Sequence, residues 1–294
     1  MTQTNDRRAM LFGLGAVLIW STVATAFKLA LRHVDHVQLL LLANVFSLVA
    51  LGVVLAVRGQ FHLLLCASGK QYRYAAALGF LNPFLYYLVL FKGYDLLPAQ
   101  VAQPVNFTWA LTMAWLSVPL LGQKLRPRDG LAGLICYSGV VILSTGGDLG
   151  SFQVGSPLGL ALVLFSTLIW ALYWIGNRRS DLDPVVGLFL GFLFALPCVF
   201  LVTVVFSDLS IPLGGWLGGA YVGAFEMGFT FVLWLTAMKL THSTARIANL
   251  IFLAPFISLV FIHFVLGEHI VPATFVGLVL IVGGLWVQQP RKRK

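Results

Sequence analysis

The chain has 294 residues, of which 59% are hydrophobic and 10% are charged. A soluble domain carries about 25% charged residues, so this chain lacks the polar surface that water would require. The net charge of +9 resides in short basic clusters between long apolar runs, so nucleic-acid binding is not expected.

Ten apolar stretches follow one another along the chain. A helix needs about 20 residues to cross the hydrocarbon core of a bilayer. The stretches cover residues 9–30, 37–57, 73–94, 99–121, 129–146, 157–176, 184–206, 214–238, 245–266 and 272–289. The first resembles a signal peptide at its start, but its length favours a permanent span. We therefore predict an all-α integral membrane protein with ten transmembrane helices.

The basic residues indicate how these spans are oriented, because lysine and arginine concentrate in cytoplasmic loops. With the N-terminus in the cytoplasm, the outer side holds Lys28, Arg32 and Lys92, and the other 16 of the 19 basic residues face the cytoplasm. An odd number of spans would place the basic C-terminal tail outside. The sequence thus predicts a multi-pass protein of the cytoplasmic (inner) membrane, in contact with the lipid bilayer, with both termini in the cytoplasm.

Short patterns recur 144 to 150 residues later in the chain, although chance similarity among apolar helices is an alternative explanation. The recurring segments are Leu18-Ile19-Trp20 with Leu168-Ile169-Trp170, Leu121-Gly122-Gln123-Lys124-Leu125 with Leu266-Gly267-Glu268-His269-Ile270, and Pro127 with Pro272. They divide the chain into residues 1–150 and 151–294, with five spans each. An odd number of spans inserts the second half in the opposite sense, which gives two inverted five-helix repeats around a central cavity.

On several of these features the chain resembles a known family. They are Trp20 late in the first stretch, Gly122-Gln123 and Gly267-Glu268 after the fourth and ninth, and glycines in the fifth and tenth. The chain is similar to the drug/metabolite transporter superfamily, in its ten-helix EamA-type branch, and within it to the amino-acid exporters of the YddG type. The resemblance implies export of amino acids, aromatic ones among them. Gln123 departs from the commoner Gly-Glu pair of the family.

Two polar residues within apolar stretches are candidates for substrate binding. Asn82 and Glu226 are 144 residues apart, so the repeat would bring both to a shared centre. An ionisable residue inside a membrane usually faces a cavity or a partner, and Glu226 is expected to accept a hydrogen bond from a substrate ammonium group or to carry a proton. A protonated glutamic acid bonded to a neighbouring helix is the structural alternative. Asn82 precedes Pro83, which can bend the helix, either to line the cavity or only for packing.

Aromatic side chains at helical spacing are candidates for the cavity wall. Together with Asn82 and Glu226, the predicted cavity residues are Trp20, Tyr86, Trp109, Trp170, Tyr173 and Phe229. Aromatic walls provide apolar contact and cation–π attraction. Tryptophan and tyrosine also anchor spans at the membrane interface, which is the competing interpretation for several of them.

The predicted function is secondary transport of amino acids or related small metabolites by alternating access, with the small-molecule substrate as partner. A membrane-embedded enzyme, or an exporter of drugs, nucleotide sugars or sugar phosphates, is the alternative. The chain has no phosphate-binding glycine loop, and its scattered acids and histidines give no metal-ligand spacing. We expect no enzyme activity, no cofactor and no metal. Ten helices can enclose a cavity without a second copy, so a monomer is expected to suffice.

Overall fold

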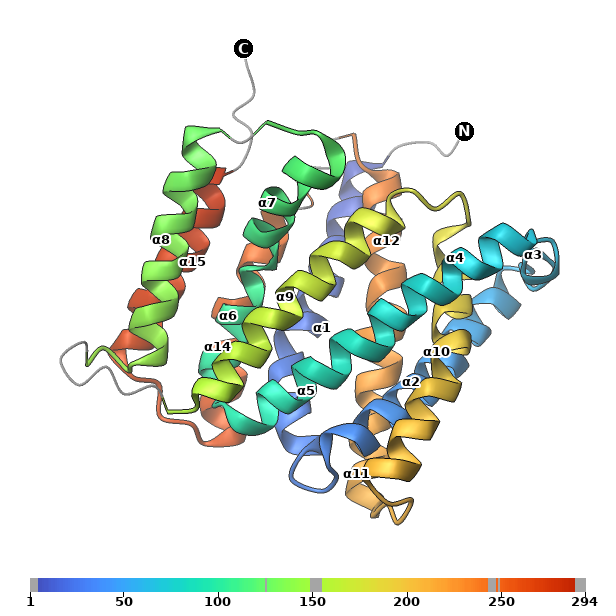
Figure 1. The fold of residues 1–294 in the computed structure, drawn as a ribbon, viewed down its shortest axis with the longest axis horizontal. Coiled ribbons are helices and arrows are strands. Elements are labelled where there is room, and N and C mark those ends of the chain that lie inside the picture. The colour runs from blue at the N-terminus through green and yellow to red at the C-terminus, as the bar shows by residue number, and fades with distance from the viewer. Residues whose placement is uncertain (1–4, 125, 149–154, 243–246, 248, 289–294) are drawn as a thin grey trace.

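The computed structural model describes residues 5–124, 126–148, 155–242, 247 and 249–288, and every regular element within them is a helix (Figure 1). The first half of the chain forms α1 (Asp6–Ala30), α2 (His36–Val57), α3 (His62–Leu65), α4 (Gly69–Gly79), η1 (Phe80–Leu85), α5 (Tyr86–Leu96), α6 (Ala99–Phe107), α7 (Trp109–Leu121) and α8 (Pro127–Ser144). The second half forms α9 (Pro157–Asn177), α10 (Pro184–Phe206), α11 (Leu213–Tyr221), η2 (Val222–Phe229), α12 (Thr230–Leu240), η3 (Asn249–Leu253), α14 (Ala254–Leu266) and α15 (Pro272–Gln288). The predicted all-α class is confirmed.

Seven helical segments in the described part of the chain are long and apolar enough to cross a membrane. They are Asp6–Ala30, His36–Val57, Gly69–Leu96, Pro157–Asn177, Pro184–Phe206, Leu213–Leu240 and Asn249–Leu266. Helices α6, α7, α8 and α15 lie in the other three predicted stretches, but they are not among the segments that are long and apolar enough to cross a membrane. The count of ten spans therefore stays a prediction. Large apolar side chains lie on the outside, including Phe206 (76% exposed), Leu213 (74%) and Phe264 (79%). Such surface requires lipid around it.

Helix ends follow local sequence signals. The Asp35 Oδ1 accepts hydrogen bonds from the backbone N–H of Val37 (2.8 Å) and Gln38 (2.9 Å), which caps α2. Gly122 and Gly267 end α7 and α14 with φ of +66° and +72°, a left-handed conformation that glycine adopts without steric cost. These two stops are 145 residues apart, the offset of the predicted repeat.

Two of the long segments are interrupted by a π-helical turn. Between α4 and α5, Asn82 has extended backbone angles (φ −144°, ψ 118°) before Pro83, which lacks the N–H that a regular helix needs. Between α11 and α12, η2 contains Glu226, and Thr230 donates its hydroxyl to the Phe225 carbonyl. π-helical turns are frequent at functional sites. The two interruptions occupy equivalent places in the halves of the chain.

Packing between the halves is reciprocal. Helix α1 packs on α12 and α14, and the equivalent α9 packs on α5 and α7. Helix α2 contacts η2, and the equivalent α10 contacts η1. The remaining close pairs are α2 with α10 and α8 with α15, and the latter pair forms one edge of the bundle in Figure 1. Most of the core is therefore built between the halves.

The α8–α15 contact depends on two glycines, which gives a stability prediction. A Cβ on Gly277 would lie 2.8 Å from the Gly139 carbonyl oxygen, whereas nothing lies within 4 Å of a Cβ on Gly283 of the same helix. We expect Gly277→Ala to destabilise the protein by about 1–3 kcal/mol, and Gly283→Ala to have little effect. Thermal unfolding of the detergent-solubilised protein measures both. Equal melting temperatures for the two variants would contradict the close approach of these helices.

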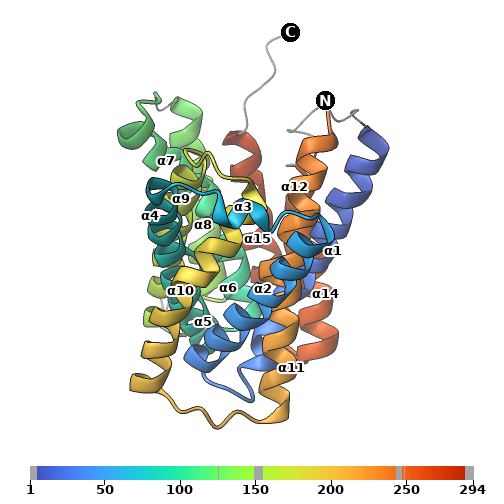
Figure 2. The ribbon, with the colours of Figure 1, turned by 90° about the vertical axis from the view of Figure 1, so that its right-hand side faces the viewer.

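The described ends of the chain lie on one side of the bundle. Figure 2 shows the start of α1 and the end of α15 at the same end, with the α10–α11 connection at the opposite end. We call these the terminal end and the distal end.

Candidate substrate site

A cavity of about 320 Å³ lies between the two halves. Its wall is formed by side chains from α1, α5, α6, α7, α9, η2, η3 and α12. They are Trp20, Val23, Phe27, Tyr86, Leu90, Tyr94, Gln103, Asn106, Phe107, Trp109, Met113, Trp170, Trp174, Glu226, Phe231, Trp234, Met238 and Ile251. The volume falls within the about 300–1,000 Å³ usual for small-molecule pockets. We call it the central cavity.

Aromatic rings that contact one another form much of the wall of the central cavity. The Trp170 ring stacks on Tyr86 with ring centroids 4.4 Å apart and planes at 27°. Phe231 lies between the repeat-related tryptophans, with its centroid 5.8 Å from Trp20 and 6.2 Å from Trp170. Trp234 packs on Trp20 at 5.3 Å. Rings that hold one another in this way present rigid faces to a ligand at little cost in side-chain entropy.

Glu226 is the charged side chain of this wall. The Tyr87 hydroxyl donates a hydrogen bond to its Oε1 at 3.1 Å, and so joins α5 of the first half to η2 of the second. Its Oε2 is buried and makes no hydrogen bond of standard geometry, although the Trp20 side chain lies near the carboxyl group as a second donor. A buried polar atom left unpaired costs about 1–3 kcal/mol, and more when charged. The carboxyl group therefore retains capacity for a donor that a ligand could supply.

Two amides lie on α6 in the same wall. The Tyr86 hydroxyl donates to the Asn106 Oδ1 at 3.3 Å, and the Asn106 Nδ2 donates to the Ser166 Oγ at 3.2 Å. Asn106 thus bonds neighbouring helices as well as lining the cavity. Gln103 is 5% exposed, and its Oε1 has no partner among the described residues. The central cavity holds two unpaired acceptor atoms, one on Gln103 and one on Glu226.

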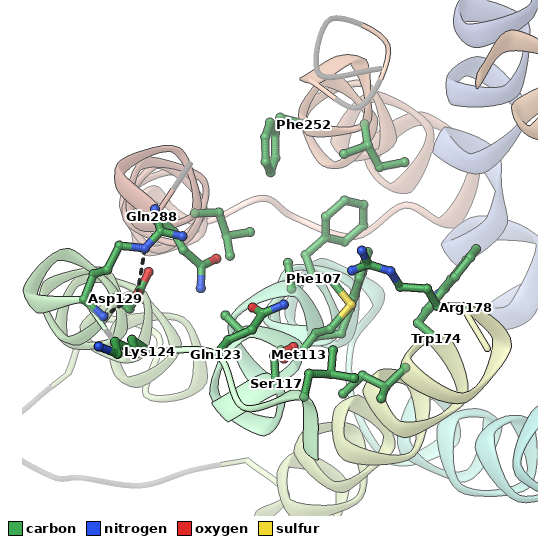
Figure 3. A pocket seen from close by; sticks show the side chains of 18 residues that line it. Phe107, Met113, Ser117, Gln123, Lys124, Asp129, Trp174, Arg178, Phe252 and Gln288 are labelled. Atoms are coloured by element: carbon green, nitrogen blue, oxygen red, sulfur yellow. Dashed lines mark hydrogen bonds and ion pairs between the residues drawn. The ribbon is translucent and has the colours of Figure 1, made fainter. Parts of the chain in front are cut away.

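The central cavity opens toward the terminal end through a second space of about 440 Å³, shown in Figure 3. The two spaces share Phe107, Trp109, Met113, Trp174 and Ile251. The outer space, which we call the mouth, is bordered by Gln123, Lys124, Arg126, Asp129, Arg178 and Gln288. Figure 3 shows Arg178, which directly follows α9, among the side chains that line the mouth.

The distal end is closed by a carboxylate on a helix N-terminus. The Glu268 Oε1 accepts the backbone N–H of Ala99 at 2.9 Å, and Oε2 accepts that of Gln100 at 3.2 Å. The Gln100 side chain donates to the His269 carbonyl (3.0 Å) and accepts from the Thr274 hydroxyl (2.7 Å). A negative charge at a helix N-terminus is favoured by the unpaired N–H groups there. These contacts, the distal latch, join the start of α6 to the α14–α15 connection.

Two cations at the same end satisfy carbonyl groups where helices stop. The Lys28 Nζ donates to the Tyr94 carbonyl at 2.8 Å and to the Leu97 carbonyl at 3.1 Å, at the end of α5. The Arg32 guanidinium donates to the Leu266 carbonyl at 3.3 Å, at the end of α14. Cations are favoured at helix C-termini, so these contacts reinforce the closed end.

The structure brings five of the eight predicted cavity residues together. Trp20, Tyr86, Trp109, Trp170 and Glu226 line the central cavity.

The other three predicted residues lie elsewhere. Asn82 and Tyr173 line a separate crevice of about 10 Å³ between η1, α9 and α10, which is room for about one water molecule. Phe229 packs on Phe225 within η2, with ring centroids 6.0 Å apart, and borders neither space. The roles of these three residues in substrate binding stay predictions, and their positions outside the central cavity do not support them.

Several wall residues were not predicted from the sequence, although a signal for them exists. Trp234 and Met238 follow Glu226 at intervals of eight and four residues, which places them on one helical face. Leu90 and Tyr94 follow Tyr86 at the same four-residue spacing. Extending each periodicity from one buried polar or aromatic residue would have found these four.

The described residues contain no cluster of three or more His, Cys, Asp or Glu side chains arranged to hold a metal ion. The chemistry of the site is therefore that of aromatic faces, two amides and one carboxyl group. Such a lining suits reversible binding of a small amphipathic molecule.

An all-helical, multi-pass membrane protein with a ligand-sized cavity open at one end has the architecture of a membrane transporter. The chain belongs to the EamA-like transporter family, whose sequence model matches residues 7–145 and 157–288. This confirms the resemblance to the drug/metabolite transporter superfamily.

Individual relatives cover almost the whole chain. The chain is 27% identical to a protein of Ancylobacter novellus named aromatic amino acid exporter YddG, over 94% of this chain and 95% of that protein. It is 25% identical to an uncharacterized transporter, YvbV, of Bacillus subtilis, over 96% and 92% of the two chains. It is also similar to a solved crystal structure, with a TM-score of 0.68, 23% identity and 95% of each chain covered. That structural similarity supports the fold.

Proposed function

We propose that the protein is a secondary transporter that exports amino acids and related small metabolites across the cytoplasmic membrane by alternating access. The observation that carries this proposal is the central cavity between the two halves, with the mouth on its side toward the terminal end and the hydrogen-bonded distal latch at the other end of the bundle. Alternating access requires a site that is accessible from one side at a time. The name of the relative from Ancylobacter novellus supports amino acids as the substrate class.

Support for two inverted five-span halves comes from the reciprocal packing. Equivalent helices make equivalent contacts, and the π-helical turns, the glycine stops and the two matches of the family model recur in both halves. On this proposal the chain crosses the membrane ten times, as two units spanning residues 1–150 and 151–294. The terminal end, with its basic clusters, then faces the cytoplasm, and the mouth is an entrance for cytoplasmic solutes.

Counterflow in proteoliposomes tests the proposed function. Labelled phenylalanine is expected to accumulate in vesicles that hold the protein and unlabelled phenylalanine, and to saturate with concentration. Asp95→Asn, which alters an exposed ion pair with Lys92 outside the cavity, is expected to transport normally. Conversion of the substrate to another compound, without accumulation, would favour the membrane-embedded enzyme instead.

Glu226 is the proposed proton carrier, because it is the titratable carboxyl group of the described cavity wall. If it carries the proton, Glu226→Gln removes the dependence of transport on pH between about pH 5 and 8. A variant that transports with an unaltered pH profile would eliminate this role and leave exchange or facilitated diffusion.

A further inference from the structure

We propose that the central cavity selects the ammonium group of its substrate and has no charged partner for a carboxylate. Organic amines with an aromatic or apolar body should then bind more tightly than the amino acids of the same side chain. This inference rests on the proposed transport function and names the chemical class that its site prefers.

The first argument for an amine ligand is the charge of the cavity wall. Among the described residues that line it, Glu226 is the one charged side chain, and no lysine, arginine or histidine accompanies it. A ligand carboxylate that leaves water needs a cation or several hydrogen-bond donors in return. An ammonium group, in contrast, meets an acidic side chain that can carry the opposite charge.

The second argument is the set of hydrogen-bond acceptors in the wall. The Glu226 Oε2 and the Gln103 Oε1 are both buried acceptors without a partner. An ammonium group has three donors and no acceptor, so it suits a wall whose buried acceptors lack partners. The wall also offers neutral donors, among them the Trp174 indole N–H, which is buried without a partner, but neutral donors compensate a carboxylate less well than a cation does.

The aromatic rings point to the same ligand. Phe231 makes T-shaped contacts with Trp20 and with Trp170, at centroid distances of 5.8 and 6.2 Å, and all three rings line the cavity. The faces of such rings attract cations, most strongly when water is excluded, and repel anions by the same quadrupole. An aromatic cage with one carboxyl group is therefore suited to a cation.

The basic residues of the mouth do not reverse this preference. Lys124 and Arg178 border the mouth and are exposed, where salt screens charges over about 8–10 Å. Neither lines the central cavity itself, and charges at the rim of a site act on the rate of entry more than on affinity.

Three ligands with one phenyl body test the preference. They are phenethylamine, which has only the ammonium group; phenylalanine, which has both groups; and 3-phenylpropionate, which has only the carboxylate. Binding to the detergent-solubilised full-length protein is measured by quenching of its tryptophan fluorescence. The phenyl ligands themselves do not contribute to this signal. We expect phenethylamine to bind roughly tenfold or more tightly than phenylalanine, and 3-phenylpropionate most weakly.

Variants of the protein test whether Glu226 causes the preference for amines. Glu226→Gln is expected to weaken phenethylamine binding roughly 10- to 100-fold without weakening 3-phenylpropionate, whereas Asp95→Asn should change neither. If Glu226→Gln does not fold, thermal shifts of the unaltered protein decide, since phenethylamine should raise the melting temperature and 3-phenylpropionate should not.

The outcomes separate this inference from the proposed function. Phenylalanine or 3-phenylpropionate binding as tightly as phenethylamine would overturn the amine preference, even if phenylalanine counterflow succeeds. Phenethylamine binding in the predicted order, with no amino-acid counterflow, would support the cation site and overturn amino acids as the transported class.

Discussion

A covalent bridge across the distal latch is expected to stop transport. In a Gln100→Cys/Thr274→Cys double variant, a short bifunctional thiol reagent should reduce counterflow to below about one-tenth of the untreated rate, because alternating access requires this end to open. The Thr274 hydroxyl donates to the Gln100 side chain at 2.7 Å, so the two positions are in direct contact. A cysteine is shorter than glutamine, and a short spacer fills the difference.

The bridging experiment needs a background without the native thiols. Cys66 is exposed and Cys198 partly so, so both are replaced, together with buried Cys136, by serine or alanine. Each single-cysteine variant treated with the same reagent is the control, and should transport at its untreated rate. Reduction of the bridge should restore activity in the double variant. Undiminished counterflow in a fully bridged protein would show that this end need not open, and alternating access would then be wrong.

Much of the fold was predictable because hydropathy reports what lipid solvates. Apolar stretches of about 20 residues define spans without knowledge of packing, and in the described part of the chain each of the ten predicted stretches contains helix. The interruptions were harder to predict. Pro83 signals the break at η1, but η2 contains no proline, and its place follows from the repeat alone.

The candidate site was predictable only in part, because residue type does not tell which helical face turns inward. Trp170 and Tyr173 are three residues apart, yet the first lines the central cavity and the second borders the separate crevice beside Asn82. Trp234 was not among the predicted cavity residues but packs on Trp20 inside the wall. The distal latch was not predicted, because Glu268 bonds to backbone N–H groups, which carry no sequence signature.

Weakening the distal latch without a bridge should shift the protein toward opening at that end. Glu268→Gln keeps an acceptor but loses the charge, and a charge-assisted hydrogen bond is worth about 1.5–3 kcal/mol, so opening should become roughly 10- to 100-fold more frequent. A Leu97→Cys reporter, which is 3% exposed beside the latch in the closed form, should react faster with a membrane-impermeant thiol reagent added to the distal side. Asp95→Asn removes a carboxylate at the same end from an exposed pair worth about 0–1 kcal/mol, and should leave the labelling rate within about twofold.

Because of the repeat, the same equilibrium can also be shifted by a variant in the first half of the chain. Gln123 occupies in the first half the position that Glu268 has in the second, directly after a left-handed glycine, and it borders the open mouth. A glutamine makes a weaker helix-capping contact than a carboxylate, which is consistent with a mouth that stands open while the distal end is closed. Gln123→Glu should therefore favour closure of the mouth and also speed labelling of the Leu97→Cys reporter. Because the two sites share no partner in the described structure, Glu268→Gln and Gln123→Glu should combine additively in free energy. Slower labelling with Gln123→Glu would mean that the two ends do not act as equivalent gates.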